Sequence, residues 1–227
     1  THWRSEELLK MIRELQPDVI LDDRLDLPYG WDIKTPEQFQ PREWVKVDGK
    51  PVVWEACQTF SGSWGYHRDE ASWKSIEQLV QMLVDTVSKG GNLLMNVGPT
   101  GRGEFDERAL ASLQGYGEWM KKHGRSIYGC TQAPDEFQSP RDCRLTWNPE
   151  TKRMYVHVFA WPFVQLHLDG FANRVEYAQL LNDASEVKMS TPSEAHIARF
   201  GEGVRDTLTL TLPVKKPNVT VPVVELF

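Results

Sequence analysis

The chain has 227 residues, a formal net charge of −6 at pH 7, a pI near 5.6 and nine tryptophans. This length allows one large domain or two modest ones. An acidic balance without runs of like charge argues against nucleic acid and anionic membranes as partners, and no apolar stretch approaches the roughly 20 residues that span a bilayer.

The first predicted elements are a helix and two strands. Apolar residues recur at helical spacing over residues 5–15, and the apolar run 19–21 predicts a short strand buried on both faces. A second strand is predicted over residues 51–59, after a turn at Asp48-Gly49. A glycine-rich, aromatic loop over residues 61–66 follows it.

The clearest element is a helix over residues 75–89, where Ser75 and Gln78 match a capping box. A buried strand over residues 92–97 and a helix over residues 106–123 come next. Strands that alternate with helices predict a parallel sheet. A closed (β/α)8 barrel needs about 250 residues and eight strands. This segment is therefore either part of such a barrel or a small α/β domain.

Beyond residue 127 the pattern changes to short β-rich runs separated by Asn, Asp, Gly and Pro, which is typical of an antiparallel β-sandwich. No long helical periodicity occurs there. The predicted strands lie near residues 144–147, 154–159, 164–168, 176–180 and 207–212.

Five motifs stand out along about 115 residues. They are QPDVILDDR (16–24), TPE (35–37), WEAC (54–57) with SWGY (63–66), VSKGGNLLMNVGPT (87–100) and IYG (127–129). In sequence and in order, these motifs resemble those of the glycoside hydrolase family 29 α-L-fucosidases. The resemblance implies that residues 1–128 are the C-terminal portion of a TIM-like (β/α)8 catalytic domain and that residues 129–227 are a C-terminal β-sandwich.

The resemblance also implies an activity, the hydrolysis of terminal α-L-fucosyl linkages with retention of configuration. Retention requires two carboxyl groups about 5 Å apart, one as nucleophile and one as acid and then base. In the family, the nucleophile is an aspartate on a strand that would precede Thr1, and nothing in this chain matches its motif. We therefore expect the chain by itself to be inactive.

Two glutamates are candidates for the acid/base. The resemblance assigns this role to Glu37 in some members and to Glu55 in others, and Glu37 is favoured because a loop-borne acid approaches the glycosidic oxygen from the aglycone side. Both have simpler interpretations. Glu37 could occupy the first turn of a short helix, where the helix dipole favours acids, and Glu55 could form an ion pair with Arg24.

Four further residues are predicted to bind substrate. Arg24 resembles the sugar-binding arginine of the family, whose guanidinium suits adjacent hydroxyls or the carboxylate of the nucleophile. Trp64 is expected against the C6-methyl face of fucose, with Trp31 and Tyr66 nearby. The simpler interpretation is that these aromatic residues pack in loops.

No cofactor and no metal is predicted, because the histidines lack ligand spacing and the glycines match no phosphate-binding loop. Cys130 and Cys143 either pair or stay free thiols. The expected partners are a fucosylated glycan or fucoside and the upstream remainder of the barrel, while a homo-oligomer and the compartment are left open. The alternative function is a non-catalytic carbohydrate-binding protein that lacks the nucleophile.

Overall fold

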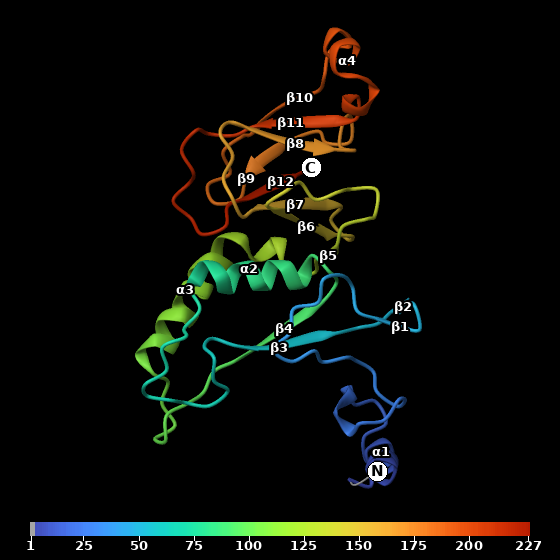
Figure 1. Ribbon diagram of the computed structural model, residues 1–227, viewed down its shortest axis with the longest axis vertical. Coiled ribbons are helices and arrows are strands. Elements are labelled where there is room, and N and C mark those ends of the chain that lie inside the picture. Colours follow the sequence, from blue (N-terminus) through green and yellow to red (C-terminus); the bar gives the residue numbers. More distant parts are fainter. Residues whose placement is uncertain (1–2) are drawn as a thin grey trace.

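The computed structural model describes residues 3–227. A layer of helices lies between a small parallel strand pair and two antiparallel sheets, and α1 (Ser5–Leu15) lies at the opposite end of the molecule from α4 (Glu194–Phe200) (Figure 1). The helix predicted over residues 5–15 is confirmed.

The strand predicted over residues 19–21 is wrong. These residues have no regular structure, and Val19 and Ile20 are exposed. The only strand-like pairing nearby is an isolated parallel bridge between Asp22 and Ile33, just before the 3₁₀ turn η1 (Asp23–Leu25). A strand buried on both faces needs neighbours that cover it, and the described residues supply only this bridge.

The turn at Asp48-Gly49 is confirmed. It joins β1 (Lys46–Val47) to β2 (Lys50–Pro51), and both turn residues have positive φ angles of 50° and 74°. This is the conformation that a two-residue hairpin requires. The strand predicted over residues 51–59 is shorter than expected. Pro51 belongs to the hairpin, and β3 extends only over Glu55–Thr59.

Helix α2 (Ile76–Val87) has the predicted capping box. Helix α3 (Glu107–His123) and strand β4 (Asn92–Asn96) also match their predictions. The parallel pairing is confirmed because β3 and β4 run side by side in parallel register. These two strands do not close a barrel within residues 3–227. The predicted burial of β4 on both faces is wrong, since Leu94 is 46% exposed.

The second half consists of two antiparallel sheets with one shared hydrophobic core. Every predicted strand of this region is present, whereas β5 (Thr131–Gln132), β10 (Lys188–Ser190), β12 (Val223–Leu226) and α4 were not predicted from the sequence. The larger sheet has the order β5 (Thr131–Gln132), β6 (Cys143–Asn148), β7 (Arg153–Val158), β12 (Val223–Leu226), β9 (Ala178–Leu180). The smaller has the order β10 (Lys188–Ser190), β11 (Thr207–Thr211), β8 (Gln165–Asp169). Cys130 and Cys143 are free thiols.

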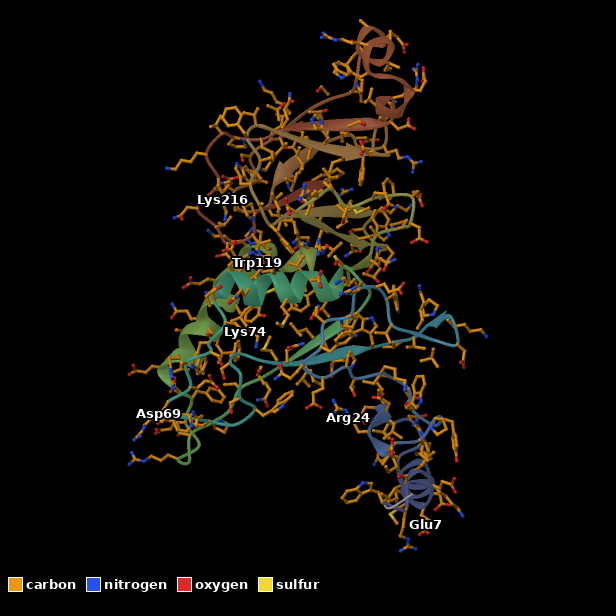
Figure 2. All side chains as sticks on the ribbon, viewed as in Figure 1. Glu7, Arg24, Asp69, Lys74, Trp119 and Lys216 are labelled. Atoms are coloured by element: carbon orange, nitrogen blue, oxygen red, sulfur yellow. The ribbon has the colours of Figure 1, made fainter. Side chains whose placement is uncertain are left out.

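Helices α2 and α3 pack against the larger sheet, and Trp119 of α3 lies at this junction (Figures 1 and 2). Its indole Nε1 donates to the carbonyl oxygen of Val221 at 3.2 Å. Val84 of α2 belongs to the same buried cluster, together with residues of β7 and β12. Arg144 of β6 donates to the carboxylate of Asp85 in α2 at 2.7 Å. The two predicted domains therefore share an apolar interface, and a boundary near residue 128 stays a prediction.

His157 of β7 is wholly buried beside this junction. Thr146 donates its single hydroxyl proton to the carbonyl oxygen of Ser126 at 2.7 Å, so His157 Nε2, 2.9 Å from Thr146 Oγ1, is the donor of that hydrogen bond. Burial and the neighbouring His123 lower the pKa of His157 to about 3. The imidazole is therefore neutral in the folded protein at ordinary pH.

We expect Trp119→Ala to lower the free energy of unfolding by about 3–5 kcal/mol, because it opens a cavity between helices and sheet. Urea denaturation followed by circular dichroism measures this change. Tyr128→Ala is the matched control, because Tyr128 is 74% exposed, and it should change stability by less than about 0.5 kcal/mol. Equal losses in the two variants would contradict a stabilising role for this interface.

Stability should also fall as the pH is lowered from about 6.5 to about 4. Unfolded His157 takes up a proton near its ordinary pKa of about 6.5, whereas the folded group resists protonation until about 3. The stabilisation is thus complete above the unfolded pKa and is lost below it, by up to about 1.4 kcal/mol per pH unit.

The test is the pH dependence of the urea midpoint in His157→Gln, which should show a shallower slope than the parent protein. His167→Gln, at an exposed histidine, should keep the parental slope. An unchanged slope in His157→Gln would contradict the assignment.

Candidate active site

Arg24 is held by the segment that carries the Thr35-Pro36-Glu37 motif. Its Nε donates to Thr35 Oγ1 at 2.7 Å, and its Nη2 donates to the Thr35 carbonyl oxygen at 3.1 Å. Its Nη1 forms an ion pair with the Glu37 carboxylate. Asp23 accepts hydrogen bonds from the backbone N–H and the hydroxyl of Thr35 at 3.0 and 2.8 Å. The QPDVILDDR and TPE motifs, which are separate in sequence, are therefore joined by hydrogen bonds and an ion pair.

The charges in this network stabilise one another. Partial burial acts to raise the pKa of Asp23, but hydrogen bonds from Thr35 and the ion pair with Lys34 outweigh it and hold the pKa below its usual value. The hydrogen bond to Glu37 is the main cause that raises the pKa of Arg24. Asp23 and Arg24 therefore both stay ionised at neutral pH.

The segment after Thr35 runs parallel to β3. Glu37 forms an isolated bridge with Cys57, and the Gln38 side chain donates to Thr59 Oγ1 at 2.9 Å. Glu37 is not part of a helix, so the first-turn interpretation is wrong. Its backbone lies level with the middle of β3, next to the C-terminal end that Gln38 reaches.

Three of the predicted residues gather around Cys57. Burial is the main cause that raises the pKa of the Cys57 thiol, Arg24 acts to lower it, and Glu55 and Glu37 also act to raise it. Glu55 is the first residue of β3. At about 3.3 Å per residue, Glu55 lies roughly 13 Å from Thr59, the last residue of the strand. The carboxylate partner of Arg24 is Glu37, so the predicted Arg24–Glu55 ion pair is wrong.

Trp31 lies in a different environment. It lines a small cavity together with Asp22 and Asp23, and the ammonium of Lys34 lies 4.2 Å from the centroid of its ring. Its indole nitrogen is buried without a hydrogen-bond partner. Trp31 lies between Arg24 and Thr35 in the sequence. Among the described residues, no hydrogen bond joins its side chain to Glu37.

Trp64 and Tyr66 belong to the loop after the C-terminal end of β3. Asn96, the last residue of β4, donates its side-chain amide to the Trp64 carbonyl oxygen at 2.6 Å, and the Trp64 side chain is 40% exposed. Gly98 allows this close approach, because a Cβ there would come within 2.5 Å of the Gly65 carbonyl carbon.

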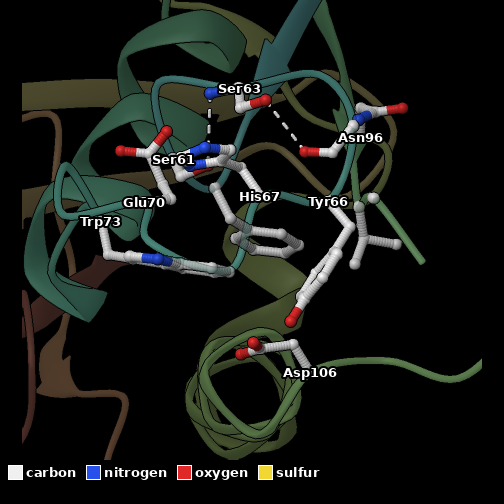
Figure 3. Close-up of a pocket in the computed structure, with 12 residues that line it drawn as sticks. Ser61, Ser63, Tyr66, His67, Glu70, Trp73, Asn96 and Asp106 are labelled. Atoms are coloured by element: carbon white, nitrogen blue, oxygen red, sulfur yellow. Dashed lines mark hydrogen bonds between the residues drawn. The ribbon is translucent and has the colours of Figure 1, made fainter. Parts of the chain in front are cut away.

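A small cavity lies behind this loop (Figure 3). Arg24, Glu37 and Glu55 do not line it, so the predicted residues do not share one cavity. Three lie around Cys57, Trp64 and Tyr66 belong to the loop, and Trp31 lies apart beside Lys34. Of the side chains that line this cavity, the sequence predicted Tyr66 but missed His67, Glu70, Trp73 and Asp106. The missed residues lie in the segments that follow β3 and β4, and this position was a usable signal.

Part of the first segment is apolar and exposed. Leu94 of β4 has the same orientation as Glu55 and Cys57 of the adjoining strand, because the parallel register pairs Cys57 with Leu94 and Glu55 with Asn92. Ile20 and Val53 are 71% and 56% exposed. These exposed apolar side chains lie in the segments that also carry Arg24, Glu37 and Glu55.

Residues 3–227 contain no cluster of three or more His, Cys, Asp and Glu side chains arranged to hold a metal ion. His2 lies outside the described residues. In the same part of the chain, none of the helices is long and apolar enough to cross a membrane.

Comparison with known proteins identifies the class. A family described as "Alpha-L-fucosidase" matches residues 1–125. Together with the acidic residues and the arginine beside a parallel strand pair, this match identifies the class as glycosidase. The chain belongs to the α-L-fucosidases of glycoside hydrolase family 29.

The relatives are longer than this chain. The plasma α-L-fucosidase of Rattus norvegicus is 40% identical over 177 residues, which cover 71% of this chain and 36% of that protein. α-L-Fucosidase isoenzyme 1 of Paenibacillus thiaminolyticus superposes with a TM-score of 0.86 at 37% identity, covering 99% of this chain and 53% of that one. The Thermotoga maritima α-fucosidase, in complex with a mechanism-based inhibitor, has a TM-score of 0.74 at 27% identity, covering 98% and 49%.

The Thr35 hydroxyl bridges Asp23 and Arg24, so its removal should loosen the network. We expect Thr35→Val to lower the free energy of unfolding by about 1–3 kcal/mol, because it leaves partners without their hydrogen bonds. Urea denaturation checks this. Thr211→Val is the matched control at an exposed strand position and should be nearly neutral. A neutral result for Thr35→Val would contradict the bridging role.

Proposed function

We propose that this chain supplies the C-terminal half of the active site of a retaining α-L-fucosidase, which hydrolyses terminal α-L-fucosyl linkages of glycans or fucosides. The observation that carries the proposal is the network in which Asp23 and Thr35 hold Arg24 against Glu37, beside β3. It joins two of the motifs that resemble the family, and the Glu37–Cys57 bridge places it beside a third. Membership of the family supports the substrate class.

Glu37 is the better candidate for the acid/base. Functional groups in barrels of parallel strands gather at the C-terminal ends of the strands. Glu37 lies level with Cys57 and next to Gln38, which reaches the last residue of β3, whereas Glu55 is the first residue of that strand. This placement supports Glu37 in catalysis and Glu55 in shaping the lower part of the site.

The reaction needs a nucleophilic carboxylate from the remainder of the protein. That carboxylate attacks the anomeric carbon while Glu37 gives its proton to the departing glycosidic oxygen, whose bond to the sugar breaks. Glu37 then takes a proton from water, and the hydroxide attacks the anomeric carbon and releases the carboxylate. Retention follows from the two displacements.

In this scheme Arg24 has a role besides binding the sugar. It holds the Glu37 carboxylate before substrate binds. Sugar hydroxyls or the nucleophile would take over its donors in the complex, which frees Glu37 to carry the proton that the leaving oxygen receives. Trp64 is proposed to lie against the C6-methyl group of fucose, with Tyr66 and Trp31 as further substrate-binding residues.

The remainder of the barrel is proposed to cover the exposed apolar residues near the site, including Ile20, Val53 and Leu94. Residues 1–128 then form the C-terminal portion of the (β/α)8 catalytic domain, and residues 129–227 form the sandwich. Burial of this apolar surface would favour association of the two halves. The fragment alone is expected to lack activity.

In the full-length protein, Glu37→Ala should lower kcat/KM on a natural fucoside by about 10²–10⁴-fold, the usual contribution of general acid–base catalysis. On an aryl fucoside with a reactive leaving group, added azide should restore turnover, because the leaving group needs no proton and azide replaces the activated water. Steady-state kinetics with and without azide measures this.

Glu55→Ala is the matched control and should show no azide rescue. Rescue in Glu55→Ala alone would transfer the acid/base role to Glu55, and rescue in neither variant would contradict both assignments. Fucose binding without turnover in the full-length parent protein would favour the non-catalytic carbohydrate-binding alternative.

A further inference from the structure

A groove lies on the outer face of the smaller sheet, away from the sandwich core. Along β8, Gln165, His167 and Asp169 are exposed on this face, whereas Leu166 and Leu168 are buried on the other. The groove has a volume of about 760 Å³, which lies in the size range of small-molecule sites. Its polar floor is therefore large enough for an organic ligand.

The floor is built from rows of hydrogen-bonding side chains across neighbouring strands. His167 lies opposite Thr209 of β11, with Nδ1 and Oγ1 2.9 Å apart, and Ser190 of β10 continues the row. In the next row Thr207 donates to the Asp169 carboxylate at 2.7 Å. These hydrogen bonds fix the side chains and leave acceptors and donors free for a ligand.

The wall of the groove is the connection between β10 and β11, which is longer than the pairing of these two strands requires. Antiparallel neighbours such as β10 and β11 can be joined by about two residues, but here residues 191–206 form α4 and the 3₁₀ turn η3 (Glu202–Val204). This segment projects at the end of the molecule (Figure 1). Its buried residue is Ile197, which fixes the helix, while His196 and Phe200 line the groove.

The wall presents aromatic surface to the floor. The rings of His196 and Phe200 lie with their centroids 4.5 Å apart, and Phe200 is 58% exposed. A large exposed ring beside polar groups is costly to leave in water without a ligand. This combination suits a molecule with one apolar face and a polar edge.

The lining disfavours anionic ligands. Asp169 is the only acidic residue that lines the groove, and no lysine or arginine lines it. Arg205, on the same connection, is already paired with Glu194 and Glu202. Residues 3–227 also contain no metal-binding cluster. A phosphate or sulfate would therefore meet a carboxylate and find no lysine or arginine to bind.

We propose that this groove binds a short neutral oligosaccharide. Sugar hydroxyls, each a donor and an acceptor, match the Thr209, His167 and Asp169 side chains of the floor. The apolar C–H face of a pyranose ring packs against Phe200 and His196. The site goes beyond the proposed hydrolysis, since it uses neither Glu37 nor Arg24, and it would hold a glycan near the enzyme at raised local concentration.

The test uses the full-length protein and three non-fucosylated trisaccharides, namely cellotriose, mannotriose and N-acetylated chitotriose. Calorimetric titration is run in saturating L-fucose, which occupies a fucose pocket. At least one trisaccharide should bind. Phe200→Ala should weaken that binding by about tenfold, and Thr209→Val, which keeps the strand-favouring shape, by about three- to tenfold.

Phe163→Ala is the matched control, because Phe163 is an exposed phenylalanine of the same half that does not line the groove, and it should bind like the parent. Binding should also persist in Glu37→Ala, which separates this site from hydrolysis. The proposal is overturned if no trisaccharide binds, if Phe163→Ala weakens binding as much as Phe200→Ala, or if a sulfated disaccharide binds more tightly. Circular dichroism verifies that each variant folds. Should Phe200→Ala fail to fold, the binding measured for Thr209→Val tests the proposal instead.

Discussion

The arrangement of the molecule depends on the helix layer that is buried from two sides. Helix α2 contacts β4 on one side and β6 on the other, and its Val80 and Val84 are fully buried. A helix in this position needs apolar residues over a wide arc, which the sequence of α2 provides. The parallel strands that carry the candidate site are thereby fixed relative to the sandwich. The sandwich therefore supports the strands next to the candidate site.

Within the site, a single hydroxyl organises three charged groups. Thr35 Oγ1 donates to Asp23 and accepts from Arg24, which then reaches Glu37. Such an alternation of donors and acceptors leaves each ion next to a compensating partner, which limits the cost of partial burial.

The candidate site is partly exposed to solvent. Arg24 and Glu37 side chains are 46% and 42% exposed, although the family carries out chemistry that is favoured by exclusion of water. Leu94 beside Cys57 is also exposed. The chain covers 53% of the similar Paenibacillus thiaminolyticus structure. In the barrel proposed above, inward-facing residues of other strands would fill the interior and enclose this same surface.

The sequence by itself determined the features that depend on neighbours a few residues apart. The cap at Ser75, the helical periodicities and the turn at Asp48-Gly49 are local. Contiguous motifs likewise identified the family. Residues 19–21 show the limit of such reasoning, because an apolar run predicts a strand only where partners exist to pair with it.

Tertiary structure alone decided which distant groups meet. It paired Arg24 with Glu37, placed Glu55 at the start of β3, and inserted β12 between β7 and β9. It also turned the connection after β10 into the wall of a groove. The physical reason is that ion pairs and strand ladders depend on distance in space, and a single sequence encodes that distance only through the packing of the whole chain.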